Sequence, residues 1–425
     1  YLDGSAVGTT HALVSTTEPN FAFYVGATSR GAVFNFGQDS TFAGAVSAGG
    51  NADANGIGDF AYAPPANHLA LCTSNLPDIT IGPGQSEQAD DNFNTVLWTG
   101  DGTTSRAITG VGFAPDFVFI KSRSHAEDPA MSDTVRGATK KLKPNGNDTE
   151  STTATAVLSA FGSDGFTGPA STPGNLNVSS RTYVAWNWKG GGSASSNSDG
   201  SIASSVSANT AAGFSIVSYT GTGSNGTIGH GLTSAPESIL IKARTRSENW
   251  LVYHKFDGGT DGRSFLNLNL TDDKFDNGAS GYFQGTPPTA SVFYQNGSSY
   301  NVSTDTYIAY CFHSVEGYSK FGSFQGNSSA DGTFVFCGFR PAYIWLKRAD
   351  ANGVDWSLFD SKRLGYNVDN NNLRAFASSP ATEQTDGDID FLSNGFKCRR
   401  NFANNQGHVI FFAWAEAPFK FSNAR

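Results

Sequence analysis

Three ten-residue stretches of the chain are near copies of one another, and they constrain its fold more than any other feature. In each, a proline is followed six residues later by a lysine: APDFVFIKSR (114–123), APESILIKAR (235–244) and RPAYIWLKRA (340–349). The residues between them are mainly β-branched, aromatic or otherwise apolar, which is typical of a buried strand. We expect each stretch to be the central strand of a repeated module, opened by the proline and closed by the lysine at its solvent end.

A second apolar stretch follows each of these strands at a similar distance: TYVAWNWK (182–189), TYIAYCF (306–312) and HVIFFAWAE (408–416). Counted from the prolines, Tyr183 lies 68 residues further on, Tyr307 lies 71 and Phe411 lies 70. The copies are 121 and 105 residues apart, far longer than the 20–50 residues of a solenoid repeat. Each copy should therefore be a small sandwich with its own core. Both faces of 182–189 are largely apolar, which predicts a strand covered on both sides.

The sequence as a whole predicts an all-β fold with three tandem antiparallel β-sandwiches of jelly-roll-like type. Its 49 glycines, 13% aromatic residues and only 15% charged residues favour short strands and tight turns over helical bundles. We expect a β-rich leader at 1–45, an irregular Pro/Gly-rich linker at 46–90, module A at 91–190, a Gly/Ser linker at 191–212, flexible at its start, module B at 213–318 and module C at 319–425. Matching hairpins are predicted at FGSDGF (161–166), FYQNGS (293–298) and FLSNGF (391–396).

Charge and hydropathy exclude two classes of partner. The formal net charge is −9, the pI is about 5.2 and no basic stripe is present, so nucleic acid is not expected as a partner. The one basic cluster, KKLKP (140–144), is predicted to be a solvated loop. No run of 18 apolar residues occurs, so no membrane insertion is expected. The chain begins with Tyr1 and not with Met, and we expect it to be processed or to be part of a longer protein.

The residues that usually carry catalysis or bind metals are few and scattered. The four cysteines, Cys72, Cys311, Cys337 and Cys398, form no CxxC pair, so buried thiols are the first interpretation and a disulfide is the alternative. His230 and His254 are expected to be structural. HExxH, GxSxG and P-loop motifs are absent from the sequence. We therefore predict no catalytic residues and no cofactor.

Two aspartate–arginine pairs occupy matching positions in modules A and C. Asp133 and Asp360 follow their prolines by 18 and 19 residues, and each precedes an arginine, Arg136 or Arg363, by three. A catalytic acid beside a cation is one interpretation. A structural ion pair used in the same way in two modules is the favoured one.

Two groups of residues are candidates for ligand binding. Asp53, Asn55 and Asp59 offer oxygen ligands among glycines and are a candidate calcium loop, with a plain Asx turn as the alternative. The tryptophans invite a sugar-binding interpretation, but those inside strands are expected to be core residues. Trp98, Trp250 and Trp356 lie nearer strand ends and are the candidates for an exposed platform.

The repeated motifs resemble an uncharacterised β-rich domain found mainly in marine tailed phages. These motifs are TG…G, P-x-x-[VI]-x-[IL]-K, F-x-x-[DN]-G and T-Y-[VI]-A, together with GYSKFGSFQGN (317–327) and the ending EAPFKFSNAR (416–425). The resemblance covers about 91–425 and implies a virion protein of the tail or fibre. Residues 1–45, with FNFGQDSTF (34–42), resemble the last strands of a SPRY-type, concanavalin-like sandwich, which has more strands than this chain provides.

The resemblance implies a non-enzymatic protein on the virion surface, a tail fibre or surface appendage for attachment to host-surface glycans. Its partners would be other virion proteins and further copies of itself, because repeated β-modules have edges that must be covered, and a homotrimer is the form expected from fibres in general. A capsid decoration or head-fibre protein is the first alternative. A glycan-degrading tailspike, which needs two carboxylates roughly 5–10 Å apart, and a secreted bacterial adhesin are the others.

Overall fold

The computed structural model describes residues 36–66, 68–75, 79–82, 85–152, 158–169, 176–259, 261–377 and 380–417. The chain forms two compact units, Tyr1–Asp78 and Ile79–Arg425. Strands and bridges take up 37% of the described residues and helical turns 3%, and the described helical pieces are 3₁₀ turns of three residues. The all-β prediction is confirmed. Most of the predicted SPRY-like leader, residues 1–35, lies outside the described residues, and 36–75 form turns with one isolated bridge, between Asn51 and Phe60.

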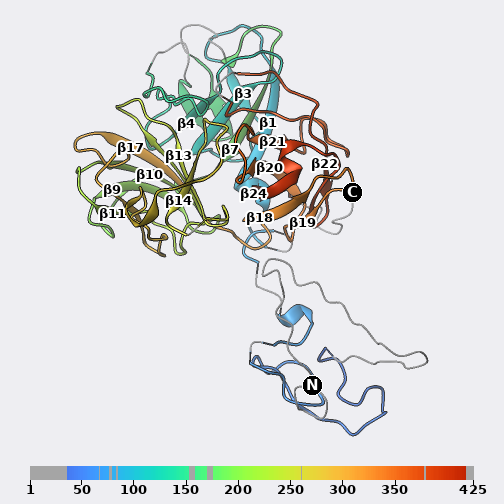
Figure 1. Cartoon of the computed structure of the whole chain (residues 1–425). Helices are drawn as coiled ribbons and strands as arrows, with labels where there is room; N and C mark the ends of the chain where they lie inside the picture. Colours follow the sequence, from blue (N-terminus) through green and yellow to red (C-terminus); the bar gives the residue numbers. More distant parts are fainter. Residues whose placement is uncertain are drawn as a thin grey trace. The chain divides into compact units, whose positions relative to one another are not determined.

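The large sheet of each module contains four antiparallel strands in the same order, and Figure 1 labels most of these strands. In every case the proline strand lies between the closing strand and a short fourth strand. Module A has β1 (Phe93–Thr99), β7 (Thr182–Trp188), β3 (Phe117–Ser122) and β4 (Ala130–Asp133). Module B has β10 (Phe214–Thr220), β17 (Thr306–Phe312), β12 (Ser238–Ala243) and β13 (Leu251–His254). Module C has β18 (Ser319–Asn327), β24 (Gln406–Ala415), β20 (Pro341–Arg348) and β21 (Ser357–Asp360).

The register of the proline strand is the same in all three modules. Its lysine pairs with one position of the closing strand: Lys121 with Val184, Lys242 with Ile308 and Lys347 with Ile410. One residue before these partners stand Tyr183, Tyr307 and Val409. The residue of module C that corresponds to the two tyrosines is therefore Val409, two residues before the Phe411 that the sequence alignment matched with them. The repeat itself is confirmed.

A smaller sheet forms the second layer of each sandwich. It contains β2 (Ala107–Thr109), β6 (Gly165–Thr167) and β5 (Ala160–Gly162) in module A, β11 (Gly226–Gly229) and β16 (Val292–Gln295) in module B, and β19 (Phe334–Phe336), β23 (Gly395–Cys398) and β22 (Ile389–Leu392) in module C. The predicted hairpins at 161–166 and 391–396 are confirmed. The one at 293–298 is wrong, because Phe293 pairs with Ile228 as Phe166 pairs with Ile108, so its Asn-Gly follows the strand and closes no hairpin.

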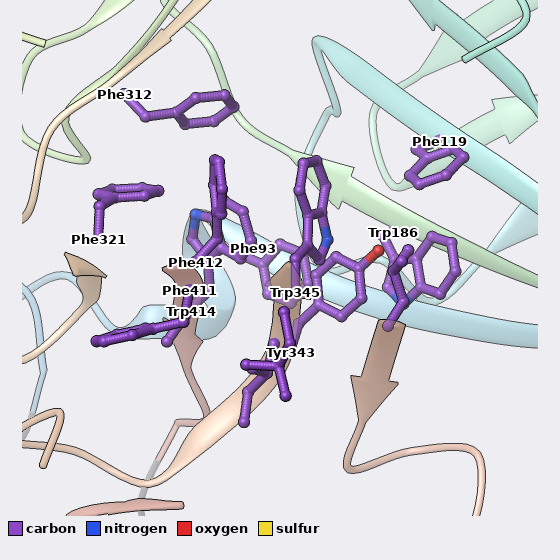
Figure 2. Packing of buried hydrophobic residues seen from close by; sticks show 14 of the residues in the cluster. Phe93, Phe119, Trp186, Phe312, Phe321, Tyr343, Trp345, Phe411, Phe412 and Trp414 are labelled. Atoms are coloured by element: carbon purple, nitrogen blue, oxygen red, sulfur yellow. The ribbon is translucent and has the colours of Figure 1, made fainter. Parts of the chain in front are cut away.

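The large sheets are buried on both faces, as predicted for 182–189. Tyr183 and Ala185 face the core between the two sheets of module A, and Val184, Trp186 and Trp188 face a central cluster to which all three modules contribute. Figure 2 shows aromatic rings of this cluster. Ring centroids lie 4.3 Å apart for Phe117 and Tyr310, 4.7 Å for Trp186 and Tyr343 and 5.8 Å for Phe312 and Trp414. The expectation of independent cores is therefore only half right, because the modules also share one.

The Gly/Ser segment between modules A and B, predicted to be a linker that is flexible at its start, pairs with the large sheet of module B. It forms β8 (Ser195–Asn197) and β9 (Ser204–Asn209), and β9 pairs along β10 with Val206 opposite Val217. At the other end of the sheet, β14 (Ser264–Asn267) and β15 (Phe275–Asp276) continue from β13. Module B thus has an eight-stranded large sheet whose outer edge at β10 is covered by the linker.

The repeated Thr-Gly motif is explained by close backbone packing. A Cβ on Gly100 would lie 2.0 Å from the carbonyl oxygen of Val178, and one on Gly221 would lie 2.1 Å from that of Val302. The residue before each of these carbonyls is a buried asparagine, Asn177 or Asn301, whose amide donates to the neighbouring loop. Only glycine allows this approach, so the motif is a structural feature of the module.

Candidate functional site

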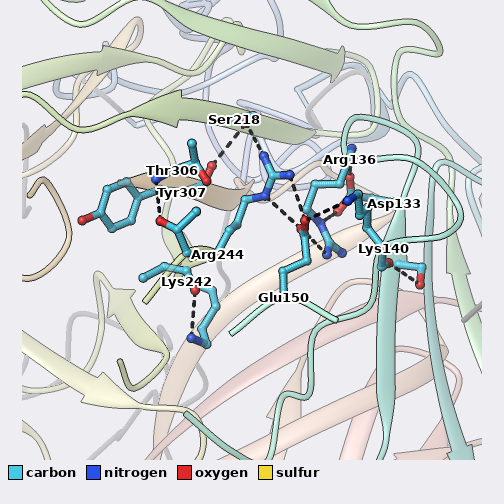
Figure 3. A network of polar contacts seen from close by, with 12 residues as sticks. Asp133, Arg136, Lys140, Glu150, Ser218, Lys242, Arg244, Thr306 and Tyr307 are labelled. Carbon is cyan, nitrogen blue, oxygen red and sulfur yellow. Dashed lines mark hydrogen bonds and ion pairs between the residues drawn. The ribbon is translucent and has the colours of Figure 1, made fainter. Parts of the chain in front are cut away.

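The buried polar residues of modules A and B meet in one network at their boundary (Figure 3). Arg136 Nε lies 2.5 Å from Asp133 Oδ2, and neither side chain is exposed. Arg136 also contacts Glu150 at 3.2 Å, and Glu150 accepts two hydrogen bonds from Arg244 of module B, at 2.9 and 3.0 Å. From module B, the hydroxyl of Tyr310 donates to Asp133 Oδ2 at 2.7 Å. The structural ion-pair interpretation is confirmed, and the pair also joins two modules.

The same network is repeated where module C meets module A. Arg363 Nε lies 2.5 Å from Asp360 Oδ2, again with both side chains unexposed, and Arg363 contacts Glu383 at 2.8 Å. Arg123 of module A donates to Glu383 at 2.8 and 3.0 Å. The indole N–H of Trp186 donates to Asp360 Oδ2 at 3.1 Å, in the place of the Tyr310 hydroxyl. Each acid–arginine pair is therefore completed by the module beside it.

Opposite charges in the first network favour the ionised forms of Arg136 and Glu150. Burial alone would lower the pKa of Arg136, but the nearby carboxylates of Asp133 and Glu150 raise it above its ordinary value. Burial would likewise raise the pKa of Glu150, but the hydrogen bond from Arg244 and the charge of Arg136 lower it. Removing one member of a buried ion pair strongly destabilises a protein, because the other member is left as an uncompensated buried charge. The role of these networks is to bind modules to one another.

The boundary between modules B and C is built from different residues at the same positions. His254 faces Ser238 of the proline strand as Asp133 faces Phe117, so it takes the place of the aspartate. Three residues later stands Asp257 in place of the arginine. Lys274 takes the place of Glu150, since its N–H donates to the carbonyl of Ala349 as the N–H of Glu150 donates to that of Arg244.

His254 packs against an aromatic side chain of module C and accepts the backbone N–H of Phe256. Its ring lies 5.0 Å from that of Phe412, the module C residue in the place of Tyr310, and it is buried. Burial lowers the pKa of His254 to about 3, so the ring is neutral at pH 7. The structural role predicted for His254 is thus an uncharged contact between modules B and C. His230 is also structural, with its ring nitrogens bonded to Thr289 and Leu232.

The lysines of the three proline strands are buried, contrary to the prediction that they mark solvent ends. They are 1%, 0% and 0% exposed, and burial lowers the pKa of each to about 8. Lys121 donates to the carbonyl of Ser122, at 2.7 Å. Lys242 and Lys347 also reach the neighbouring module, where they donate to the carbonyls of Asn147 and Thr271, both at 3.3 Å. Lys242 and Lys347 therefore form further bonds between modules, whereas Lys121 bonds within module A.

The tryptophans predicted to form an exposed platform are buried. Trp250 is 0% exposed and donates to the carbonyl of Lys143 in module A at 2.9 Å, and Trp356 is 1% exposed and faces Asn267 of module B. Trp98 is 9% exposed and stacks on Tyr183 at 5.2 Å. The expected exposure is wrong because Trp250 and Trp356 lie against a neighbouring module and Trp98 packs in the core of module A. The KKLKP cluster is also more than a solvated loop, since Leu142 within it is fully buried.

The candidate calcium loop is held by its own hydrogen bonds. The carboxylate of Asp53 accepts N–H groups of Asn55, Ile57 and Ala70 and the amide of Asn75. Desolvation would raise its pKa, and these bonds lower it to about 2. Asn55 itself bonds to Asn75, and Asp59 accepts the N–H of Ser40. The three residues are thus directed to different partners, and the described part of the chain has no cluster of three His, Cys, Asp or Glu side chains suited to a metal.

The cysteines are free thiols, and Cys311, Cys337 and Cys398 are buried, as predicted. Burial raises the pKa of Cys398 to about 12, so it stays protonated. Within the described residues, no helix has the length and apolarity needed to cross a membrane. These three thiols are core residues, whereas Cys72 is half-buried.

Sequence reasoning missed the residues that complete the networks, Glu150, Glu383, Arg123 and Arg244. The two arginines had a local signal, because each stands two residues after the repeated lysine, and module C has Ala349 at that place. The glutamates had none, since Glu150 and Arg244 are 94 residues apart.

Comparison with known families gives one match. A family model described as a domain of unknown function (DUF7483) matches residues 88–418, which span modules A, B and C. No curated protein matches the sequence.

Proposed function

The chain belongs to the DUF7483 family, and we propose that it is a non-enzymatic structural protein on the surface of a virus particle. In this proposal it forms a tail fibre or another surface appendage that presents its modules for attachment to host-surface glycans. The repeated motifs that resemble tailed-phage virion proteins support it, and they lie largely within the matched residues 88–418.

One structural observation carries the proposal: the inner framework is repeated, and the outer parts differ. The buried lysine occurs three times and the aspartate–arginine pair twice, and Lys242, Lys347 and both pairs form hydrogen bonds to the neighbouring module. The small outer sheet, by contrast, has a hairpin in modules A and C and a different loop in module B. A fixed frame with divergent surface loops suits a protein that presents binding surfaces, because loops carry recognition while the frame positions them.

The location can be tested on intact particles. Antibodies against the full chain, coupled to gold, should label tail fibres or tail-tip appendages in electron micrographs. Label confined to capsid faces or vertices would contradict the tail position and favour a decoration or head-fibre protein. Label on bacterial cells and none on particles would overturn the virion proposal in favour of an adhesin.

Attachment and the absence of catalysis need a second experiment. The purified full chain should bind host cells, and pre-incubation with it should reduce particle adsorption. Host polysaccharide incubated with the chain should keep its length distribution. Shortening of the polysaccharide would contradict the non-enzymatic assignment and favour a tailspike activity. Self-association into a homo-oligomer stays a prediction, which light scattering of the full chain would check.

A further inference from the structure

Module B departs from its sister modules at the small outer sheet. In modules A and C a third strand, β5 or β22, pairs with β6 or β23. Among the described residues of module B the small sheet has two strands only, and the loop around η4 (Gly278–Ser280) lies beside β16. The N–H of Asn296 donates to the carbonyl of Tyr282 at 2.9 Å, and the amide of Gln284 donates to the carbonyls of Gln295 and Gly226 at 2.7 and 3.1 Å.

This replacement leaves a hollow of about 240 Å³, here named the module B pocket. Its polar lining comes from Asn225, Ser280, Gln284, Asn296 and Ser298. The volume is below the roughly 300–1,000 Å³ of sites for drug-sized ligands, so it suits a single ring-sized unit. Modules A and C fold with a strand in this place, so the loop is not a requirement of the module fold.

The lining offers both donors and acceptors that the fold does not use. Asn225 accepts the N–H of Gly297 through Oδ1 at 3.2 Å, which leaves its amide N–H groups for a ligand. Gln284 uses its N–H groups on two carbonyls, which leaves Oε1 as an acceptor. The hydroxyl of Ser280, on an exposed residue, can do either. Asn296 is fixed by donating to the Ser280 carbonyl at 3.0 Å, so the lining is held in place.

The chemistry of this lining selects the class of ligand. Its side chains carry amides and hydroxyls and no formal charge, so they match neutral hydroxyl groups better than an anion or a cation.

We propose that the module B pocket binds one uncharged sugar unit of a surface glycan, an inference that rests on the proposed attachment function. Asn225 donates to a ring hydroxyl, and Gln284 Oε1 accepts from a neighbouring one. Modules A and C, which keep the third strand, do not share this site.

Saturation-transfer NMR on the full chain with glucose, galactose, mannose and N-acetylglucosamine tests the inference. At least one sugar should receive saturation. Asn225→Asp keeps the acceptor for Gly297 but removes the N–H donors, and it should weaken binding about fivefold or more, as expected for the loss of a hydrogen bond. Ser280→Leu should abolish binding by filling the pocket. Asn352→Asp is the matched control, because Asn352 is also exposed and accepts a backbone N–H through Oδ1. It should leave binding unchanged.

The outcomes separate this inference from the proposed function. The proposal that the pocket binds a sugar would be contradicted if none of the four sugars received saturation. It would also be contradicted if a sugar received the same saturation from the wild-type protein as from Ser280→Leu. If Ser280→Leu loses sugar binding and also loses host-cell binding, both proposals are supported. If Ser280→Leu loses sugar binding but the chain labels no virus particle, the pocket stands and the virion assignment fails.

Discussion

The Tyr310 hydroxyl donates to the Asp133 carboxylate at 2.7 Å across the boundary between modules B and A. The same position of module A, Trp186, donates to Asp360 of module C, and the same position of module C, Phe412, packs on His254 of module B. The closing strand of each module thus contacts the fourth strand of the next. The three contacts form a closed cycle, so the modules are arranged as the subunits of a trimer would be, within one chain.

Asp133→Asn should destabilise the protein strongly. The substitution keeps the side-chain shape but leaves the unexposed guanidinium of Arg136 with less compensating charge. We expect the free energy of unfolding to fall by about 3 kcal/mol, the scale for breaking a buried pair. Urea unfolding followed by tryptophan fluorescence measures it. Asp199→Asn, at an exposed loop position, is the control and should change little. A loss below about 1 kcal/mol for Asp133→Asn would contradict the role assigned to this network.

The cyclic arrangement predicts that the chain tolerates a cut between modules A and B. A protease site inserted between the exposed residues Ser198 and Asp199 opens the β8–β9 turn. Because module A contacts both B and C, the two fragments should co-elute in size-exclusion chromatography at about 1 µM. In the double variant Asp133→Asn/Asp360→Asn, which weakens both contacts, the cleaved fragments should separate. Separation of the fragments with intact networks would contradict a closed cycle.

His254→Asp should destabilise the protein unless module C also supplies a hydrogen-bond donor to the new carboxylate. A carboxylate at this position would face the ring of Phe412, and we expect a loss of about 3 kcal/mol in the free energy of unfolding. Phe412→Tyr in the same chain supplies the hydroxyl that Tyr310 supplies to Asp133, and should recover about 1–2 kcal/mol. Phe412→Tyr alone is the control. If the losses in the free energy of unfolding from His254→Asp and Phe412→Tyr simply add in the double variant, the boundary between modules B and C is not equivalent to that between A and B.

The neutral His254 predicts a dependence of stability on pH. Its pKa in the folded protein is about 3, against 6.5 when unfolded, so below pH 6.5 the unfolded chain binds a proton that the folded chain does not. The contribution of His254 to the free energy of unfolding is therefore fully present above pH 6.5 and is lost as the pH decreases toward 3. His254→Phe removes the effect. Relative to wild type, the variant should gain about 2 kcal/mol between pH 7 and pH 5.

The comparison with the variant is needed because Asp369 acts in the opposite direction. Burial raises its pKa to about 7, so stability due to Asp369 decreases as the pH rises from about 4 to 7. The wild-type profile contains both effects, whereas the difference between the two proteins isolates His254. A difference that does not change between pH 7 and pH 5 would show that His254 is protonated or exposed in the folded protein.

The fold could be predicted where a local pattern determines the structure. The proline strands follow from their apolar runs, and the hairpins at 161–166 and 391–396 follow from Asp-Gly and Asn-Gly between phenylalanines. The linker strands β8 and β9 could not be predicted, because a serine-rich run has weak strand preference and is ordered by pairing with β10. Apolar residues on both faces of β7 predicted burial but did not identify the covering surface, which comes from other modules.

The candidate sites failed for a related reason. Trp250 lies near a strand end, which in an isolated sandwich is an exposed place, and only the neighbouring module covers it. The local pairs Asp133–Arg136 and Asp360–Arg363 were visible because three residues separate their members. The residues that complete the networks come from distant parts of the chain: Glu150 and Arg244 are 94 residues apart, and Arg123 and Glu383 are 260 apart. Such separations are beyond the range of a local sequence pattern.

The closed cycle of modules has a consequence for how such a protein changes over generations. In an assembly of three identical subunits, one altered codon changes all three faces at once, and a substitution that helps one face must be tolerated by the others. Here each face is encoded separately, so module B can have a loop where modules A and C have a strand. The ratio of the three modules is also fixed because they are translated as one chain, so dilution cannot dissociate them.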